Sequence, residues 1–262
     1  MRHIPRKRFG QNFLTDQTVI DAIVAAVDPR PDDRMIEIGP GLGALTRPLA
    51  AKVRHLHAVE IDRDLTARLA REFASRGVAI HQADVLEFDF SRFGPDLRIV
   101  GNLPYNISTP ILFVLARVAA LLHDIHVMLQ KEVVDRMAAS PGSSAYGRLS
   151  VMLQYRFRIE RVLEVPASAF EPVPQVASAV ARLLPLTHRD PARDEALFAR
   201  IVTRAFSHRR KTLRNTLKPF LNNAEFEMLH IDPRARPQEL PVADFVRIAN
   251  HLAQPNAAAA PG

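Results

Sequence analysis

Met35-Ile36-Glu37-Ile38-Gly39-Pro40-Gly41-Leu42-Gly43 carries the strongest structural signal in the chain. Its first four residues are apolar apart from one carboxylate, which predicts a buried strand, and the apolar pattern from Leu45 onward predicts a helix. The alternating glycines between them let the backbone approach a ligand, and the free N–H groups of the helix start can bind it. A strand, a glycine-rich turn and a helix in this order favour an α/β fold.

Three more predicted strands, at residues 55–59, 78–81 and 97–100, end in polar side chains. These side chains are Glu60 with Asp62, then Asp84, then Asn102. In an open α/β sheet the carboxyl ends of the strands form the ligand-binding edge. We therefore predict a nucleoside cofactor, with its ribose hydroxyls at Glu60 and its adenine amine near Asp84.

The glycine-rich turn departs from the Gly-x-Gly-x-x-Gly pattern of dinucleotide sites, which favours S-adenosylmethionine instead. Glu37 allows two interpretations. It either lies near the methionine amine of that cofactor, which we favour, or is a plain carboxylate at the end of a strand.

Asn102-Leu103-Pro104-Tyr105 is the candidate reaction centre. Asn102 offers a side-chain carbonyl, Leu103 a backbone carbonyl fixed by the following proline, and Tyr105 an aromatic face. Two acceptors and a stacking surface suit a planar amine. A simple strand-to-helix turn explains the same residues equally well.

Composition is typical of a folded protein with an anionic partner. The chain has 262 residues, 47% hydrophobic content and a net charge of +7. We expect no membrane span, because no apolar run approaches the roughly 18 residues of a span, and no signal peptide, because residues 1–8 lack an apolar stretch. The absence of Cys excludes disulfides and thiolate metal sites and fits a cytoplasmic protein. His55 and His57 alternate on a strand but have no further ligands nearby, so we expect no metal.

Two basic stretches lack any carboxylate. The first contains Arg2, Arg6, Lys7 and Arg8, and the second, residues 196–224, contains Arg200, Arg204, Arg209, Arg210, Lys211, Arg214 and Lys218. Each is either a solvated surface or a contact for nucleic acid. For the second stretch we favour nucleic acid, because phosphates would relieve the mutual repulsion of seven cations.

The pattern changes near residue 186, where a polar, proline-containing linker begins. We predict a catalytic domain at 1–186, net +3, and a helical domain at 187–262, net +4, with helices at 195–206, 211–221, 224–229 and 242–252 and a frayed tail. In the first domain, prolines around Phe170 predict a rigid loop with an exposed ring for base stacking, although a core position is nearly as plausible. For residues 9–14 the residues alone favour a hydrophobic staple over a lid on a ligand.

Six motifs in order resemble the rRNA adenine N6,N6-dimethyltransferases, most closely the bacterial small-subunit (16S) type, over about residues 6–252. They lie at residues 10–14, 37–43, 102–105, 130–133, 170–174 and 209–214. The resemblance implies a Rossmann-like class I methyltransferase sheet with helices on both faces. It also implies transfer of methyls from S-adenosylmethionine, with S-adenosylhomocysteine as product, to N6 of two adjacent adenosines near the 3′ end of small-subunit rRNA. Gln175 and Ala177 depart from the family pattern, which leaves local RNA contacts open.

The resemblance also implies roles for individual residues. For the cofactor these are Asn12, Leu14, Glu37, Gly39, Gly41, Glu60, Asp84, Val85 and Asn102. For catalysis they are Asn102, Leu103, Pro104, Tyr105 and Phe170, with Tyr105 and Phe170 sandwiching an extruded base. For RNA contacts the two basic stretches and the motif at 209–214 together predict Arg6, Lys7, Arg8, Arg209, Arg210, Lys211 and Arg214. Asn12 and Leu14 thus form a lid, against the staple expected from the residues alone.

The expected partner is rRNA within the immature 30S subunit, bound by a monomer. Three alternatives stay open at this point. The chain could be a large-subunit rRNA adenine dimethyltransferase or a DNA adenine methyltransferase, or it could act mainly by binding, as a ribosome-assembly factor.

Overall fold

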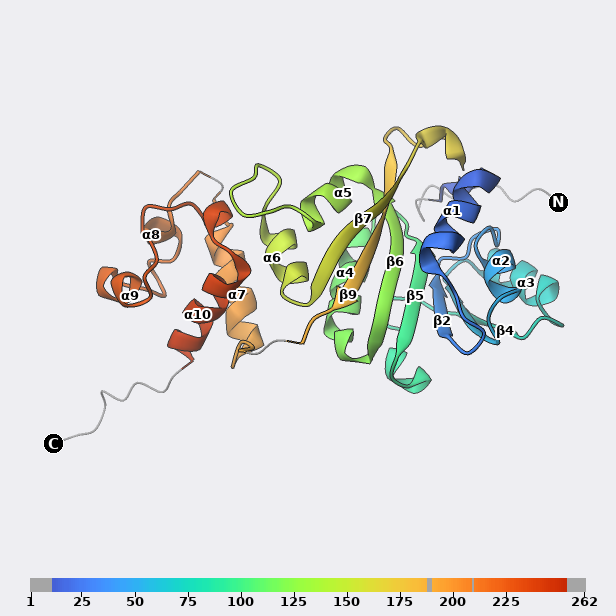
Figure 1. Ribbon diagram of the computed structural model, residues 1–262, viewed down its shortest axis with the longest axis horizontal. Helices are drawn as coiled ribbons and strands as arrows, with labels where there is room; N and C mark the ends of the chain where they lie inside the picture. Colours follow the sequence, from blue (N-terminus) through green and yellow to red (C-terminus); the bar gives the residue numbers. More distant parts are fainter. Residues whose placement is uncertain (1–10, 188–189, 209, 254–262) are drawn as a thin grey trace. The chain divides into compact units, whose positions relative to one another are not determined.

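The computed structural model describes residues 11–187, 190–208 and 210–253. These residues form two compact units (Figure 1). One unit contains the described residues up to Asp135 and Phe157–Pro185, and the other contains Arg136–Arg156 and the described residues from Leu186 onward. Within the described ranges, every helix is too short or too polar to cross a membrane.

The first unit is built on a sheet of seven strands in the order β4-β3-β2-β5-β6-β9-β7. The first five strands in this order, β4, β3, β2, β5 and β6, are parallel. Strand β9 is antiparallel to both of its neighbours, β6 and β7. The strands are β2 (Arg34–Ile38), β3 (His55–Glu60), β4 (Val78–Gln82), β5 (Leu97–Asn102), β6 (Leu122–Gln130), β7 (Phe157–Val165) and β9 (Ser178–Pro185). A separate two-stranded sheet pairs β1 (Phe13–Leu14) with β8 (Phe170–Glu171).

Helices lie on both faces of this sheet (Figure 1). On one face, α1 packs with Met35, Val100 and Met128, while the alternate residues of these strands point to the other face, where α4 lies. The helices are α1 (Gln17–Val27), α2 (Thr46–Ala50), α3 (Arg63–Glu72), α4 (Ser108–Arg117) and α5 (Lys131–Met137), with 3₁₀ turns η2 (Phe90–Phe93), η3 (Ala119–Leu121) and η4 (Ala167–Ala169). The fold class expected from the sequence is confirmed.

Local sequence explains where the helices near the site begin. The Asp16 side chain caps α1 by accepting from Val19 N, and the Asp62 side chain caps α3 by accepting from Asp64 N. Because only Ile61 separates Asp62 from the end of β3, the cap fixes the chain just after the strand ends.

The second unit is helical and has its own apolar core. Its elements are α6 (Arg148–Gln154), α7 (Glu195–Ala205), α8 (Leu213–Thr216), α9 (Asn223–Met228), η5 (Pro237–Glu239) and α10 (Val242–Leu252). Phe198, Phe226 and Phe245 are fully buried in this core. The helix expected at 211–221 is much shorter, since α8 ends at Thr216, before Pro219.

The domain boundary differs from the expectation in one respect. The units divide between Pro185 and Leu186, close to the predicted boundary, but Arg136–Arg156 belongs to the second unit and not to the sheet unit. The reason is packing, because Tyr146, Val151 and Tyr155 are buried in the core of the helical unit. Periodicity alone could not assign a single short helix, α6, to one of two cores.

Candidate active site

A cavity of about 280 Å³ opens at the carboxyl ends of the parallel strands. Its walls come from the ends of β2, β3, β4 and β5 together with β1. It contains every residue predicted for the cofactor, namely Asn12, Leu14, Glu37, Gly39, Gly41, Glu60, Asp84, Val85 and Asn102. Leu103, Pro104 and Tyr105 line it as well, so the reaction centre and the cofactor residues share one cavity.

The glycine-rich turn forms the wall after β2. Gly39 and Gly41 have φ angles of +67° and +59°, a region that residues with a Cβ rarely adopt. Arg47 holds the turn from outside, because its guanidinium donates to the carbonyls of Leu42 (2.8 Å) and Gly43 (3.1 Å) and to Glu72. The turn therefore presents backbone to the cavity without side chains in the way.

Glu60 ends β3 and is oriented by backbone donors. Its carboxylate accepts from Asp62 N at 2.9 Å and from Gly41 N at 3.2 Å. Burial raises the pKa of Glu60, and these two N–H donors act in the opposite direction. A carboxylate held in this way at a cavity wall has lone pairs left for a pair of hydroxyls.

Glu37 is 2% exposed in the middle of the wall. Its Oε2 atom has no hydrogen-bond partner among the described residues. Burial raises the pKa of Glu37 to about 7, and the nearby Glu60 carboxylate contributes to the rise. A buried carboxyl with an unpartnered oxygen is suited to a cationic partner such as an amine.

Asp84 follows β4 and its side chain accepts from Leu86 N at 2.9 Å, which closes a tight turn beside buried Val85. The turn therefore brings the Asp84 carboxylate, a hydrogen-bond acceptor, next to the apolar side chain of Val85. This combination suits the edge and face of a purine.

Asn102 ends β5, and its amide orientation follows from one contact. Its Nδ2 donates to the Asn12 carbonyl oxygen at 2.9 Å. Because a carbonyl can only accept, the Asn102 Oδ1 atom must point the other way, as an acceptor. Leu103 N donates to Met128 O at 3.1 Å, which fixes the next peptide against β6.

The first described residues of the chain form one wall of the cavity. Gln11 to Leu14 line the cavity, and β1 is held by β8 through the pairs Phe13–Glu171 and Leu14–Phe170. The Thr15 and Asp16 N–H groups both donate to Ala169 O. Residues 11–14, called the lid segment below, therefore cover one side of the cavity, while Leu14 also packs with Ile20 of α1 as a staple would; residue patterning had no signal for the position at the cavity.

Phe170 is the exception among the residues predicted for catalysis and the cofactor. The expected exposed ring is 2% exposed and packs in the core with Leu14, Ala169 and Val180. Pairing of β8 with β1 turns the side chain inward, so the ring does not line the cavity and the core interpretation holds.

The two strand histidines His57 and His81 form a hydrogen bond with each other (Nδ1 to Nε2, 3.0 Å). No cluster of three metal-binding side chains occurs in the described residues.

Of the residues predicted to bind RNA, Arg6, Lys7, Arg8 and Arg209 lie outside the described residues. Arg210, Lys211 and Arg214 are exposed in the helical unit. In the described part of the chain, none of these three forms an ion pair. Gln11 and Ile61 also lie at the cavity, although neither was predicted from the sequence; Ile61 is a 43% exposed apolar residue directly after Glu60.

The strand order, the glycine-rich turn after β2 and the acidic end of β3 define a class I methyltransferase. Two solved structures share the fold. A dimethyladenosine transferase from Plasmodium falciparum has a TM-score of 0.75 at 24% identity, covering 90% of this chain and 95% of that one. The 23S rRNA methyltransferase ErmE has a TM-score of 0.72 at 26% identity, covering 93% and 100%.

Sequence comparison gives the family. The model of the ribosomal RNA adenine dimethylase family matches residues 2–254, and the chain belongs to this family. Relatives called ribosomal RNA small subunit methyltransferase A include that of Chromobacterium violaceum, 58% identical over 253 residues (96% of this chain, 97% of the relative). That of Dechloromonas aromatica is 54% identical over 251 residues (95% and 98%). The family suggested by the motifs is confirmed.

Proposed function

We propose that the protein dimethylates N6 of two adjacent adenosines near the 3′ end of small-subunit rRNA, with S-adenosylmethionine as methyl donor, during maturation of the 30S subunit. The observation that carries the proposal is the shared cavity, in which Asn102, Leu103 and Tyr105 adjoin the cofactor residues. The relatives of 54–58% identity, named for the small subunit, support the choice of substrate.

The cavity residues fit the proposed donor. Glu37, with its unpartnered buried oxygen, would receive the methionine amine, and Gly39 and Gly41 would let the donor lie against backbone. Glu60 would hold the ribose hydroxyls, and Asp84 with Val85 the adenine. When bound, S-adenosylmethionine supplies a methyl group on a positively charged sulfur, which is open to attack by a nucleophile.

The residues of the chain explain how a weak nucleophile can attack. The lone pair of an adenine amine is delocalised into the ring, and two acceptors that hold its hydrogens out of the ring plane make it available. Asn102 Oδ1, oriented by the Asn12 carbonyl, and the Leu103 carbonyl would take this role, and the fact that both residues line the cavity supports it. Their oxygens also stabilise the positive charge that develops on nitrogen, by preorganised dipoles.

No general base is needed before attack, because the methylated amine is strongly acidic and loses its proton afterwards. Positioning supplies much of the remaining rate, since alignment of reactants can be worth several kcal/mol. The adenine must leave its stack to reach the cavity, and Tyr105 at the wall offers a ring face for it.

The test is incubation of the protein with labelled methyl donor and small subunits that lack the modification. We expect label in small-subunit rRNA alone, recovered as N6,N6-dimethyladenosine after nucleoside analysis. Large-subunit particles and duplex DNA serve as parallel substrates. Label in large-subunit rRNA, or in DNA, would assign the chain to one of the alternative activities.

The assembly-factor alternative needs a separate measurement. A catalytically inactive variant that restores normal growth and subunit profiles would show that binding matters more than methylation.

A further inference from the structure

The hydroxyl of Tyr105 has a partner inside the protein. Its oxygen lies 2.6 Å from Ser178 Oγ, across 73 positions of sequence. Ser178 is the first residue of β9 and is fully buried, and it is not among the described residues that line the cavity. The contact therefore joins an aromatic ring at the cavity wall to the interior of the sheet.

The anchor at the sheet end is rigid. Ser178 pairs with Gln130 of β6 on one side and with Val165 of β7 on the other, so its backbone is held between two strands. At the opposite end of the tyrosine, the Ser108 hydroxyl donates to the Tyr105 carbonyl at 3.2 Å. Both ends of Tyr105, backbone and ring tip, are thus fixed by serine hydroxyls.

The hydroxyl would be unnecessary if the ring only stacked. Burial raises the pKa of Tyr105, so the phenol stays protonated and can share its hydrogen with Ser178. The aromatic residues among those lining the cavity are Phe13 and Tyr105, and Phe13 lies against Gly41. With Phe170 buried, Tyr105 is the ring that remains for a base among the described residues.

We propose that Ser178 is a positioning residue for methyl transfer, whose hydroxyl holds the Tyr105 ring tip so that the ring faces an adenine placed beside Asn102 and Leu103. The inference rests on the proposed function, since it requires a base to be stacked. Without the tether the ring visits other orientations, and a smaller fraction of bound complexes is aligned for attack. The loss should appear in the rate of transfer and not in binding of the methyl donor.

The test is a double-mutant cycle with Tyr105→Phe, Ser178→Ala and the combined variant, on small subunits that lack the modification. We expect each single variant to lower the single-turnover rate by about fivefold to tenfold, as for one lost hydrogen bond. The combined variant should lose no more than either single one, because both remove the same contact. Affinity for the methyl donor, measured by calorimetry, should stay unchanged in all three.

Two variants control for lost stability. Ser150→Ala removes another fully buried serine hydroxyl, which donates to Arg136 O, and Tyr146→Phe removes a buried hydroxyl without a partner among the described residues. Both should keep the wild-type rate when assayed well below the unfolding temperature. Ser178→Thr keeps a hydroxyl and should keep most of the rate.

Wild-type rates in Tyr105→Phe overturn the inference, even if Ser178→Ala does not fold. Losses that multiply in the combined variant also overturn it. An inactive wild-type protein would instead refute the proposed function and, with it, this inference. Since the wild type is assayed first, the two failures are distinguishable.

Discussion

Asn102 is the residue at which the lid segment, the sheet and the proposed reaction meet. Its Nδ2 group is bonded to the Asn12 carbonyl, which leaves Oδ1 as the acceptor. We expect Asn102→Ala to lower single-turnover methylation by about a hundredfold or more, as for loss of a preorganised dipole, and to leave donor affinity largely intact. A rate within about tenfold of wild type, or about 1.4 kcal/mol of barrier, would contradict this role.

Glu37 makes stability depend on pH. Burial raises its pKa from 4.5 to about 7, so the folded state keeps a proton that the unfolded state has lost across this window. The protonated Glu37 therefore contributes fully to the free energy of unfolding below about pH 4.5, and this contribution is lost as the pH rises through 7. The total loss is up to about 3 kcal/mol. In Glu37→Gln, the free energy of unfolding should no longer decrease in this way between pH 5 and 8. Denaturant titration at several pH values measures the difference.

The same substitution tests the proposed amine contact. Glu37→Gln should bind the methyl donor more weakly, because the amide cannot carry the charge that pairs with the ammonium group. If the variant keeps wild-type affinity and the wild-type pH profile of stability, Glu37 is only a carboxylate at a strand end.

At this scale the sequence predicts some residues well and others not at all. Glu60, Asp84 and Asn102 were identifiable because parallel strands bring their carboxyl ends to one edge. Phe170 was not, since its inward orientation depends on a two-residue strand pairing with residues more than 150 positions away. Ser178 carries no local signal either, because its role comes from a contact across the sheet.

At the level of secondary structure, the neighbouring strands β2 and β5 come close together at Gly101. A Cβ at this position would collide with the Ile38 carbonyl oxygen in the neighbouring strand. We expect Gly101→Ala to separate the strands beside the reaction centre and to lower the free energy of unfolding by about 1–3 kcal/mol. Gly147→Ala is the matched control, because a Cβ there meets nothing within 4 Å, and denaturant unfolding compares the two.

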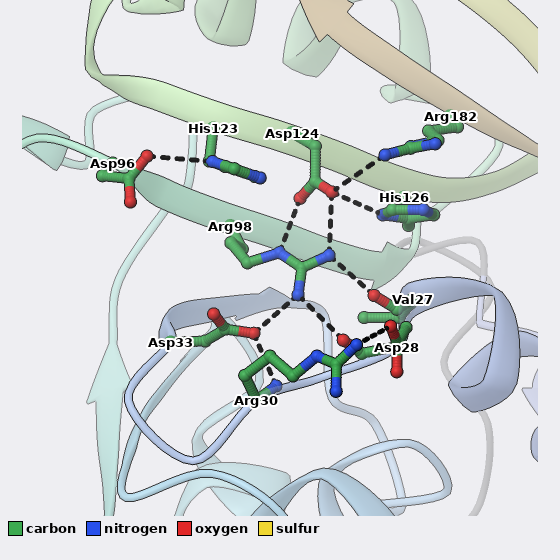
Figure 2. A network of polar contacts seen from close by, with 10 residues as sticks. All are labelled: Val27, Asp28, Arg30, Asp33, Asp96, Arg98, His123, Asp124, His126 and Arg182. Atoms are coloured by element: carbon green, nitrogen blue, oxygen red, sulfur yellow. Dashed lines mark hydrogen bonds and ion pairs between the residues drawn. The ribbon is translucent and has the colours of Figure 1, made fainter.

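At the opposite end of β5, Arg98 joins three elements (Figure 2). Its guanidinium forms a two-pronged contact with Asp124 at the start of β6 (2.9 and 2.8 Å) and binds Asp33 before β2 (2.6 Å). It also donates to Val27 O at the end of α1 (2.6 Å). Burial lowers the pKa of the adjacent His126 to about 4, so this ring stays neutral beside the cations.

Removal of one partner from this network should be costly. Asp124 is 1% exposed, so Arg98→Met leaves a buried carboxylate without its main partner and should cost about 3–5 kcal/mol of unfolding free energy. The double variant Arg98→Met/Asp124→Leu should recover much of the loss. Arg30→Met, which breaks a solvent-exposed pair with Asp28 in the same region, should change stability by less than about 1 kcal/mol. If Arg30→Met lowers the free energy of unfolding as much as Arg98→Met, the buried ionic contacts of Arg98 stabilise the protein no more than an exposed pair.

For the whole molecule, composition and charge predicted two parts but not the path of the chain between them. The Arg136–Arg156 segment leaves the sheet unit and returns to it at β7, and a sequence pattern cannot show this excursion. The change from strands to helices after β9 was predictable, because strand periodicity stops near residue 186 and helical periodicity follows.

The exposed cations of the helical unit should act together on RNA. Arg210, Lys211 and Arg214 are exposed and form no ion pairs within the described residues, so phosphates can neutralise them. Their replacement by Gln should weaken binding to small-subunit rRNA and reduce the slope of log affinity against log salt by about two to three. Arg247→Gln is the control, because Arg247 already pairs with Asp244 at 2.8 Å. An unchanged slope in the triple variant would remove this segment from the interface.

The pairing of β1 with β8 has a consequence for how the protein is made. In the described structure, β1 pairs only with β8, so the lid segment must wait for residues 170–171 to leave the ribosome. During synthesis, the glycine-rich turn and the acidic ends of the strands emerge long before β8, the strand that pairs with β1 at the wall of the cavity. A growing chain stopped ahead of β8 would therefore have an open, unfinished cavity, and competence for the methyl donor should arrive late in translation.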